Sequence, residues 1–233
     1  MTSQLNGEMT GDIVVRARDV ARTFGKGPTA VIAVHGVSCE VHACEQVALT
    51  GPSGSGKTTL LHLFAGLDVP TTGDIDWPAI GSIHELRPGP IAVVFQGPSL
   101  LPPLDVVENV ALPLLLQGTN RATARSEAIV ALERLDLMAL ASKLPEELSG
   151  GQAQRVAVAR VLAGQPRLIL ADEPTGQLDH ASGALVVDAL IEAATTLGAA
   201  LIVNTHDRAI SDRFDIHWSM AGGRLTEKAP TPC

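Results

Sequence analysis

The stretch Gly51-Pro-Ser-Gly-Ser-Gly-Lys-Thr-Thr59 decides the fold of this 233-residue chain. A β-branched run at residues 46–49 precedes it and a helical pattern over 57–65 follows it. This is the strand, glycine turn and helix that the pattern G-x-x-x-x-G-K-[ST] needs in order to hold phosphate groups. Glycines let backbone N–H groups approach the phosphates, and the start of the helix adds partial positive charge. We expect the whole stretch to bind a triphosphate through Gly51, Pro52, Ser53, Gly54, Ser55, Gly56, Lys57, Thr58 and Thr59.

The chemistry of a bound triphosphate assigns roles to two of these side chains. The Lys57 ammonium is expected to reach the β and γ phosphates, and the Thr58 hydroxyl to ligate a metal ion, Mg²⁺. The alternative is a glycine-rich turn that matches the pattern by accident, and the strand and helix on either side argue against it.

Strands and helical stretches alternate along the rest of the chain, which favours an α/β fold with a mainly parallel sheet. The stretch from 104 to 163 contains no convincing strand, so we expect a helical subdomain, at about 97–163, inserted in a single domain of residues 1–233. The predicted strands are 13–15, 30–34, 46–49, 91–95, 168–171 and 201–204, and the predicted helices are 57–65, 126–135, 151–162 and 181–196.

An apolar strand at 168–171 delivers two carboxylates, Asp172 and Glu173, at its C-terminal end. Open α/β sheets bind ligands at that edge. We expect Asp172 to hold Mg²⁺, directly or through water, and Glu173 to orient or deprotonate an attacking water. The alternative is a strand end with two solvated acids. Gln96 and His206 follow comparable apolar runs, and each taken alone would be a structural residue.

The segment Leu148-Ser-Gly-Gly-Gln152 stands at the head of the predicted helix 151–162. Ser149 suits an N-cap, and the two glycines leave the first N–H groups uncovered, which makes a second anion site. As a bare pattern it is equally a loop and a cap. One triphosphate in one chain has no evident use for two such sites.

Composition narrows the classes of partner. Hydrophobic residues are 45% of the chain and charged residues 18%, as in folded globular proteins. The net charge of −8 argues against broad binding to nucleic acid or to an anionic lipid surface. No apolar run is long enough for a membrane helix, and the first dozen residues lack the features of a secretory signal. We expect a cytoplasmic protein that meets the membrane only through a protein partner.

These motifs together resemble the ATP-binding subunits of ABC transporters. Residues 51–58, Gln96, 148–152, Asp172-Glu173, 176–179 and His206 occur in the order and approximate spacing of that family, and the likeness covers nearly the whole chain. It implies the ABC ATPase form of the P-loop NTPase fold, with a mainly parallel core sheet, a small antiparallel β-subdomain and an inserted helical subdomain. It also implies ATP and Mg²⁺ as cofactors, and hydrolysis in which Lys57, Glu173 and His206 take part.

The resemblance also implies an assembly. Two copies should pair head to tail, so that Ser149, Gly150, Gly151 and Gln152 of one copy close on the γ-phosphate held by the other. By the same likeness Gln96 senses the metal, Asp179 communicates across the dimer, His206 clamps the γ-phosphate and Phe24 stacks on adenine. Separate transmembrane subunits would hold the protein on the inner face of the cell membrane. No nucleic-acid partner is implied.

Within the family, residues 171–179 resemble the subgroup that serves lipoprotein release, macrolide export and cell division, which favours export or extraction of a substrate. Two features depart from the usual pattern. The span from Gly73 to Gln96 is short, and Asp105 stands where Thr is common. Import, or a soluble ABC ATPase without a permease, are the alternatives; the second class generally carries two cassettes or long coiled-coil insertions, which this chain lacks.

Overall fold

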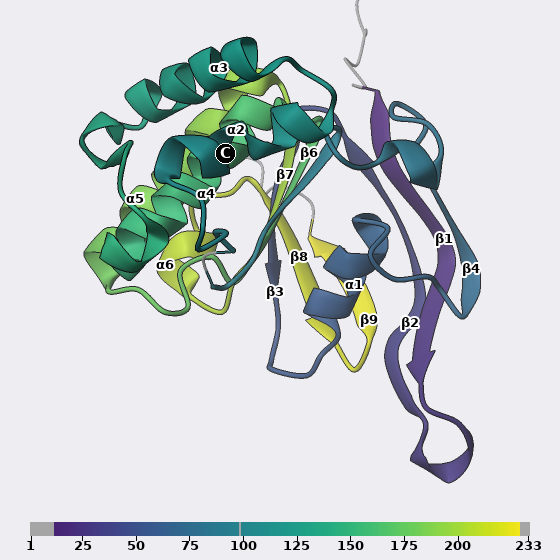
Figure 1. Cartoon of the computed structure of the whole chain (residues 1–233). Helices are drawn as coiled ribbons and strands as arrows, with labels where there is room; N and C mark the ends of the chain where they lie inside the picture. Colours follow the sequence, from purple (N-terminus) through teal and green to yellow (C-terminus); the bar gives the residue numbers. More distant parts are fainter. Residues whose placement is uncertain (1–11, 98, 229–233) are drawn as a thin grey trace, which may run out of the picture.

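The computed structural model describes residues 12–97 and 99–228 (Figure 1). Residues 1–11, to which most of the expectation about a secretory signal applies, lie outside this part. The strands are β1 (Ile13–Phe24), β2 (Val31–His42), β3 (Gln46–Thr50), β4 (Thr72–Asp76), β5 (Ile91–Val94), β6 (Leu168–Asp172), β7 (Ala200–Asn204), β8 (Ile216–Ala221) and β9 (Arg224–Lys228). The helices are α1 (Lys57–Phe64), α2 (Val106–Leu116), α3 (Arg121–Arg134), α4 (Gly150–Gly164), α5 (His180–Leu197) and α6 (Arg208–Ser211). Short 3-10 turns cover η1 (Gly27–Thr29), η2 (Ile83–Glu85), η3 (Met138–Leu140) and η4 (Pro145–Glu147).

The strands form two sheets. In the larger sheet the order is β5-β6-β7-β3-β8-β9, with parallel pairing up to β8 and an antiparallel edge strand β9. The smaller sheet, β2-β1-β4, is antiparallel throughout. Figure 1 shows α1 between the two sheets, and α2 to α5 gathered on the opposite side of the larger sheet. The expected mainly parallel core and small antiparallel sheet are both confirmed.

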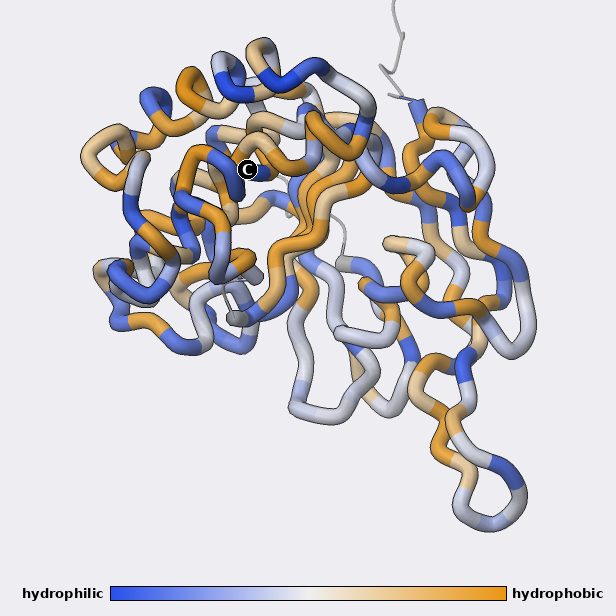
Figure 2. Tube along the Cα trace, in the orientation of Figure 1, coloured by the Kyte–Doolittle hydropathy of each residue, from blue (hydrophilic) through white to orange (hydrophobic). Residues whose placement is uncertain are grey.

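The central strands β6 and β7 are apolar up to their last residues, Asp172 and Asn204, because they are buried on both faces. In β6, Leu168 and Leu170 join the core that contains α1 and the small sheet, whereas Ile169 and Ala171 join the core that contains α2 to α5. Successive side chains of a strand point to opposite faces, so one run of residues serves both layers. Figure 2 shows these strands as the hydrophobic centre of the molecule.

The helices α2, α3 and α4 pack on one another and fill the expected helical stretch. Asp105, which departs from the family pattern, caps α2: its carboxylate accepts a hydrogen bond from the Glu108 backbone N–H at 2.8 Å. Thr and Asp are both good N-caps, so the difference keeps the helix start. In the part of the chain that the structure describes, no helix is long and apolar enough to cross a bilayer.

Each predicted strand overlaps an observed one, but β1 and β2 are far longer than the predicted 13–15 and 30–34. Strands β4, β8 and β9 were not predicted. Despite the short span from Gly73 to Gln96, β4 begins at Thr72 and pairs with β1, which completes the small sheet.

Candidate active site

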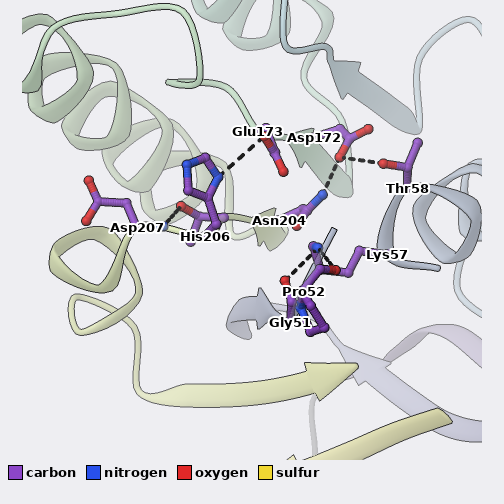
Figure 3. Close-up of polar contacts among 10 residues, drawn as sticks. Gly51, Pro52, Lys57, Thr58, Asp172, Glu173, Asn204, His206 and Asp207 are labelled. Carbon is purple, nitrogen blue, oxygen red and sulfur yellow. Dashed lines mark hydrogen bonds and ion pairs between the residues drawn. The ribbon is translucent and has the colours of Figure 1, made fainter. Parts of the chain in front are cut away.

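The loop from β3 to α1 is built for close approach of the backbone. Gly56, the residue before α1, has a φ of 103°. A Cβ at this position would lie 2.0 Å from the Ala33 carbonyl oxygen, so only glycine fits. Lys57 is 6% exposed, and its ammonium donates hydrogen bonds to the carbonyl oxygens of Gly51 at 2.8 Å and Pro52 at 3.0 Å (Figure 3). The loop therefore holds a buried positive charge at the N-terminus of a helix.

Polar side chains from β6 and β7 meet beside this loop (Figure 3). Asp172 and Asn204 are paired in register at the C-terminal ends of these parallel strands. The Thr58 hydroxyl donates to Asp172 Oδ1 at 3.1 Å, and the Asn204 side-chain amide donates to the same oxygen. The first turn of α1 is thus joined to the carboxylate that ends β6, and the two residues expected to ligate Mg²⁺ lie side by side.

Glu173, which follows Asp172, and His206, two residues after Asn204, lie next to each other. Glu173 Oε2 is 3.4 Å from His206 Nδ1, and the side chains are 28% and 69% exposed. The Glu173 backbone has a φ of 45°, and its N–H donates to the Asn204 carbonyl at 3.0 Å. Left-handed backbone in a residue other than glycine costs about 1–3 kcal/mol and gathers at functional sites. Glu173 therefore combines a left-handed backbone with a carboxylate that contacts the His206 imidazole.

The donor set fits a hard cation. Thr58 and Asp172 offer a hydroxyl and a carboxylate oxygen, the ligands that Mg²⁺ prefers. Among residues 12–97 and 99–228, no group of three or more His, Cys, Asp or Glu side chains could hold a metal ion by itself. A metal here would need further oxygen ligands, for which Gln96, a bound phosphate and water remain the candidates.

The 148–152 segment forms the expected cap of α4. The Ser149 hydroxyl accepts from the Gln152 backbone N–H at 3.3 Å, and the Ser149 N–H donates to Gln152 Oε1 at 3.0 Å. A Cβ on Gly151 would lie 3.1 Å from the Ser182 Cβ in α5, so glycine lets the two helix starts approach. Ser149 and Gly150 are exposed, which leaves this helix start open to a ligand or partner.

Asp179 caps α5 beside that contact. The Ser182 backbone N–H donates to Asp179 at 3.0 Å and the Ser182 hydroxyl at 2.7 Å. The Ser182 backbone N–H and then its hydroxyl lower the pKa of the Asp179 carboxyl from its ordinary value. Asp179 therefore keeps its negative charge at the exposed start of α5.

The Gln96 loop is tied to α4. Gln154 donates to the Phe95 carbonyl at 2.8 Å, and Arg160 donates to the Ser99 carbonyl at 2.8 Å and to its hydroxyl at 2.6 Å. Burial lowers the pKa of the Arg160 guanidinium from its ordinary value. Gln96 itself is exposed and lies against Gly176, whose Cβ would be 2.9 Å from Gln96 Nε2.

Phe24 ends β1 and is 43% exposed. The Arg22 guanidinium lies over its ring, 4.6 Å from the centroid. Asp68 holds that guanidinium through two contacts, Nε to Oδ2 at 2.8 Å and Nη2 to Oδ1 at 2.7 Å. One face of the Phe24 ring is thus in contact with the Arg22 guanidinium, which Asp68 holds in place.

The structure brings together Lys57, Thr58, Asp172, Glu173 and His206 around the loop. The 148–152 segment and Asp179 form a separate group at the starts of α4 and α5, and Phe24 stands at the end of the β1 strand. Three further residues of the site were not predicted from the sequence: Asn204, Arg22 and Asp68. Only Asn204 left a signal, as a polar residue ending the apolar run of β7.

Comparison with known proteins identifies the family of the chain. The family model described as "ABC transporter" matches residues 34–176. The lipoprotein-releasing system ATP-binding protein LolD of Shewanella sp. (strain MR-4) is 39% identical over 92% of this chain and 96% of its own length. LolD of Pseudomonas syringae pv. tomato is 39% identical over 94% of this chain and 100% of its own.

Solved structures agree as well. The ATP-binding cassette MJ0796, described as a dimer in a post-hydrolysis state bound to ADP and Pi, has a TM-score of 0.83 and 32% identity, covering 94% of this chain and 100% of its own. CbiO1 of Clostridium perfringens, described as part of the ABC transporter complex cbiONQ, has a TM-score of 0.82 and 29% identity, covering 94% and 89%. Because the family model matches residues 34–176 and these relatives align over more than nine-tenths of the chain, the chain belongs to the ATP-binding subunits of ABC transporters.

Proposed function

We propose that this chain hydrolyses Mg²⁺-bound ATP to drive a complex that extracts or exports lipoproteins through separate membrane subunits. The observation that carries the catalytic part is the hydrogen bond from Thr58 of the 51–59 loop to the Asp172 carboxylate, next to which Glu173 contacts His206. The lipoprotein part is supported by the names of relatives that align over more than nine-tenths of the chain.

Each side chain has a task in this reaction. Backbone N–H groups of the loop and the Lys57 ammonium bind the β and γ phosphates, where negative charge is spread in the transition state. Thr58 and Asp172 would hold Mg²⁺, which neutralises phosphate charge when bound. Glu173 orients the attacking water and accepts its proton. His206, within 3.4 Å of Glu173, is placed to contact the γ-phosphate and the same water.

Two copies would complete the site. The 148–152 segment is a helix start at which Ser149 and Gly150 are exposed, and the start of a helix favours binding of an anion. Within the chain it packs on α5 at Ser182 and makes its cap hydrogen bonds internally. We propose a head-to-tail homodimer in which this segment of one copy covers the γ-phosphate bound by the other. The dimeric MJ0796 relative supports pairing of such cassettes.

The membrane subunit would bind to an apolar groove of about 600 Å³ between β5 and α2. Leu67, Phe95 and Leu116, which are 44%, 38% and 65% exposed, contribute to its lining. Phe95 precedes Gln96, so the groove is continuous with the loop that reaches Gly176. We propose residues 97–163 as the helical subdomain, inserted in a single domain of residues 1–233, that passes nucleotide-driven motion to this partner. The protein would then act on the inner face of the membrane.

Affinity capture tests the assignment. Tagged Glu173→Gln protein is incubated with ATP and Mg²⁺ in detergent-solubilised native membranes, and co-purifying proteins are identified by mass spectrometry. We expect a stoichiometric multi-spanning protein. The double variant with Leu116→Glu added to Glu173→Gln should not recover the multi-spanning protein, because the substitution puts a charge in the groove. Val130→Glu, at an exposed apolar site of α3 outside the groove, is the matched control and should retain it.

Recovery of ribosomes, DNA or soluble proteins alone would contradict the transporter assignment. Equal recovery with Leu116→Glu and Val130→Glu would leave the transporter and reject the groove as its docking surface.

A further prediction concerns the adenine base of ATP. Phe24→Ala should weaken ATP binding roughly 5- to 150-fold, because stacking of a base on an aromatic side chain contributes about 1–3 kcal/mol. Binding of inorganic tripolyphosphate, which has no base, should be unchanged. Phe24→Trp is the control that keeps an aromatic face and should restore ATP affinity. The measurement is isothermal titration calorimetry with both ligands. An equal loss of affinity for ATP and for tripolyphosphate would contradict stacking and indicate that the pairing of β1 and β2 is damaged.

A further inference from the structure

Asn204 lies between the strand that ends in Asp172 and the strand that leads into the 51–59 loop. It ends β7 and lies in register with Asp172 of β6 on one side and Leu49 of β3 on the other. Its carbonyl accepts the Glu173 N–H at 3.0 Å. The residue thus touches Asp172 at the end of β6, Glu173 directly after that strand, and the strand that leads into the 51–59 loop.

The Asn204 side chain is a poor choice for stability. The rest of β7 is apolar and buried, and Asn204 is 1% exposed. Among the residues that the structure describes, its Oδ1 is buried and has no hydrogen-bond partner. A buried polar atom without a partner destabilises a fold, whereas an apolar side chain of similar volume would complete the core.

The Nδ2 atom of Asn204 gives a reason for an asparagine at this position. A carboxylate can only accept hydrogen bonds, so the amide must turn its Nδ2 toward Asp172, as the contact with Oδ1 shows (Figure 3). Thr58 donates to that same oxygen at 3.1 Å. Two donors from different elements therefore fix the rotation of the Asp172 carboxylate, and Oδ2 takes part in neither contact.

We propose that Asn204 is a positioning residue for the Mg²⁺-nucleotide site, acting through Asp172. The inference rests on the proposed function, because the cation is the one that ATP hydrolysis needs. By holding Oδ1, Asn204 keeps the carboxylate in the orientation in which it reaches both Thr58 and the metal. Partners that orient metal ligands in this way typically change metal affinity by about 10- to 100-fold when they are lost.

Asn109 provides a contrast within the same chain. It is also fully buried, but its Oδ1 accepts from Leu101 N–H at 2.7 Å, and its Nδ2 donates to the carbonyls of Leu101, Leu104 and Asp105 at 3.2, 2.9 and 3.1 Å. Both ends of that amide are used to hold a loop. Asn109 is thus a structural asparagine, whereas the amide contact of Asn204 goes to a candidate metal ligand.

The test compares Asn204→Val with Asn109→Val and the wild type. Thermal unfolding without nucleotide measures stability, and ATP binding is titrated calorimetrically in EDTA and over a series of Mg²⁺ concentrations. For Asn204→Val we expect unchanged or raised stability, unchanged ATP affinity in EDTA, and a Mg²⁺ requirement for tight binding raised about 10-fold or more. Asn109→Val should lose stability and keep its Mg²⁺ requirement.

An unchanged Mg²⁺ requirement in Asn204→Val would overturn the proposal, as would a loss of stability like that of Asn109→Val. Failure of the wild type to bind ATP at all would instead refute the proposed function on which it rests.

Discussion

Glu173→Gln lowers the steady-state rate of ATP hydrolysis by about 10²- to 10⁴-fold and leaves ATP affinity near the wild-type value. The amide keeps the shape of the side chain but cannot accept a proton, and loss of a general base costs a factor of this size. Because closed dimers would no longer be released by hydrolysis, the variant should accumulate as an ATP-dependent dimer. The measurements are phosphate release, ATP titration and light scattering with and without ATP.

The control for this variant is Glu133→Gln, which makes the same change at an exposed position of α3. It should keep the wild-type rate. Hydrolysis by Glu173→Gln at the wild-type rate would refute the catalytic assignment. A monomer at every ATP concentration, combined with a lost rate, would keep Glu173 as the base and reject the proposed dimer.

Lys57→Met weakens ATP binding at least about tenfold, the second large effect expected. Hydrogen bonds to charged groups contribute about 1.5–3 kcal/mol each, and the ammonium is the one charged side chain within residues 51–59. The methionine keeps an unbranched chain of similar length in a 6% exposed position, so the loop should remain filled. Calorimetric titration with ATP gives the affinity directly.

Lys143→Met removes the same charge outside this site and serves as the matched control. It should bind ATP like the wild type. Equal affinities for Lys57→Met and Lys143→Met would remove the ammonium from the phosphate site. If Lys57→Met instead unfolded at a lower temperature without nucleotide, the hydrogen bonds to Gly51 and Pro52 would be its main contribution.

The local motifs could be predicted because each contains its own structural cause. The 51–59 loop needs glycines beside a strand and a helix, and the 148–152 segment carries its cap residue within itself. Strand β9 pairs with β8 across the two-residue turn at Gly222-Gly223, which is a local hairpin signal, so the sequence did contain the information for these two strands. Strand β4 is short and polar, and it pairs with residues of β1 more than 50 positions earlier in the chain. Such long-range pairing cannot be derived from a local pattern.

The missed site residues have the same origin. Arg22 and Asp68 are 46 residues apart, and nothing near either one indicates that their side chains meet behind Phe24. Asn204 is visible in the sequence as a polar end to an apolar strand. Its meaning depends on Asp172, 32 residues away, which becomes its neighbour only when β6 and β7 align.

The helix α4 links places that are far apart along the chain. Its first turn carries Ser149 at the cap, and its later turns bond to Phe95 and Ser99 through Gln154 and Arg160. Fifteen residues of α-helix form a rod of roughly 22 Å, with every turn braced by its own hydrogen bonds. A partner that displaces the Ser149 end would therefore move the whole helix as a rigid body. The Gln96 loop, which is bonded to α4, and the apolar groove that α4 helps to line would move with it.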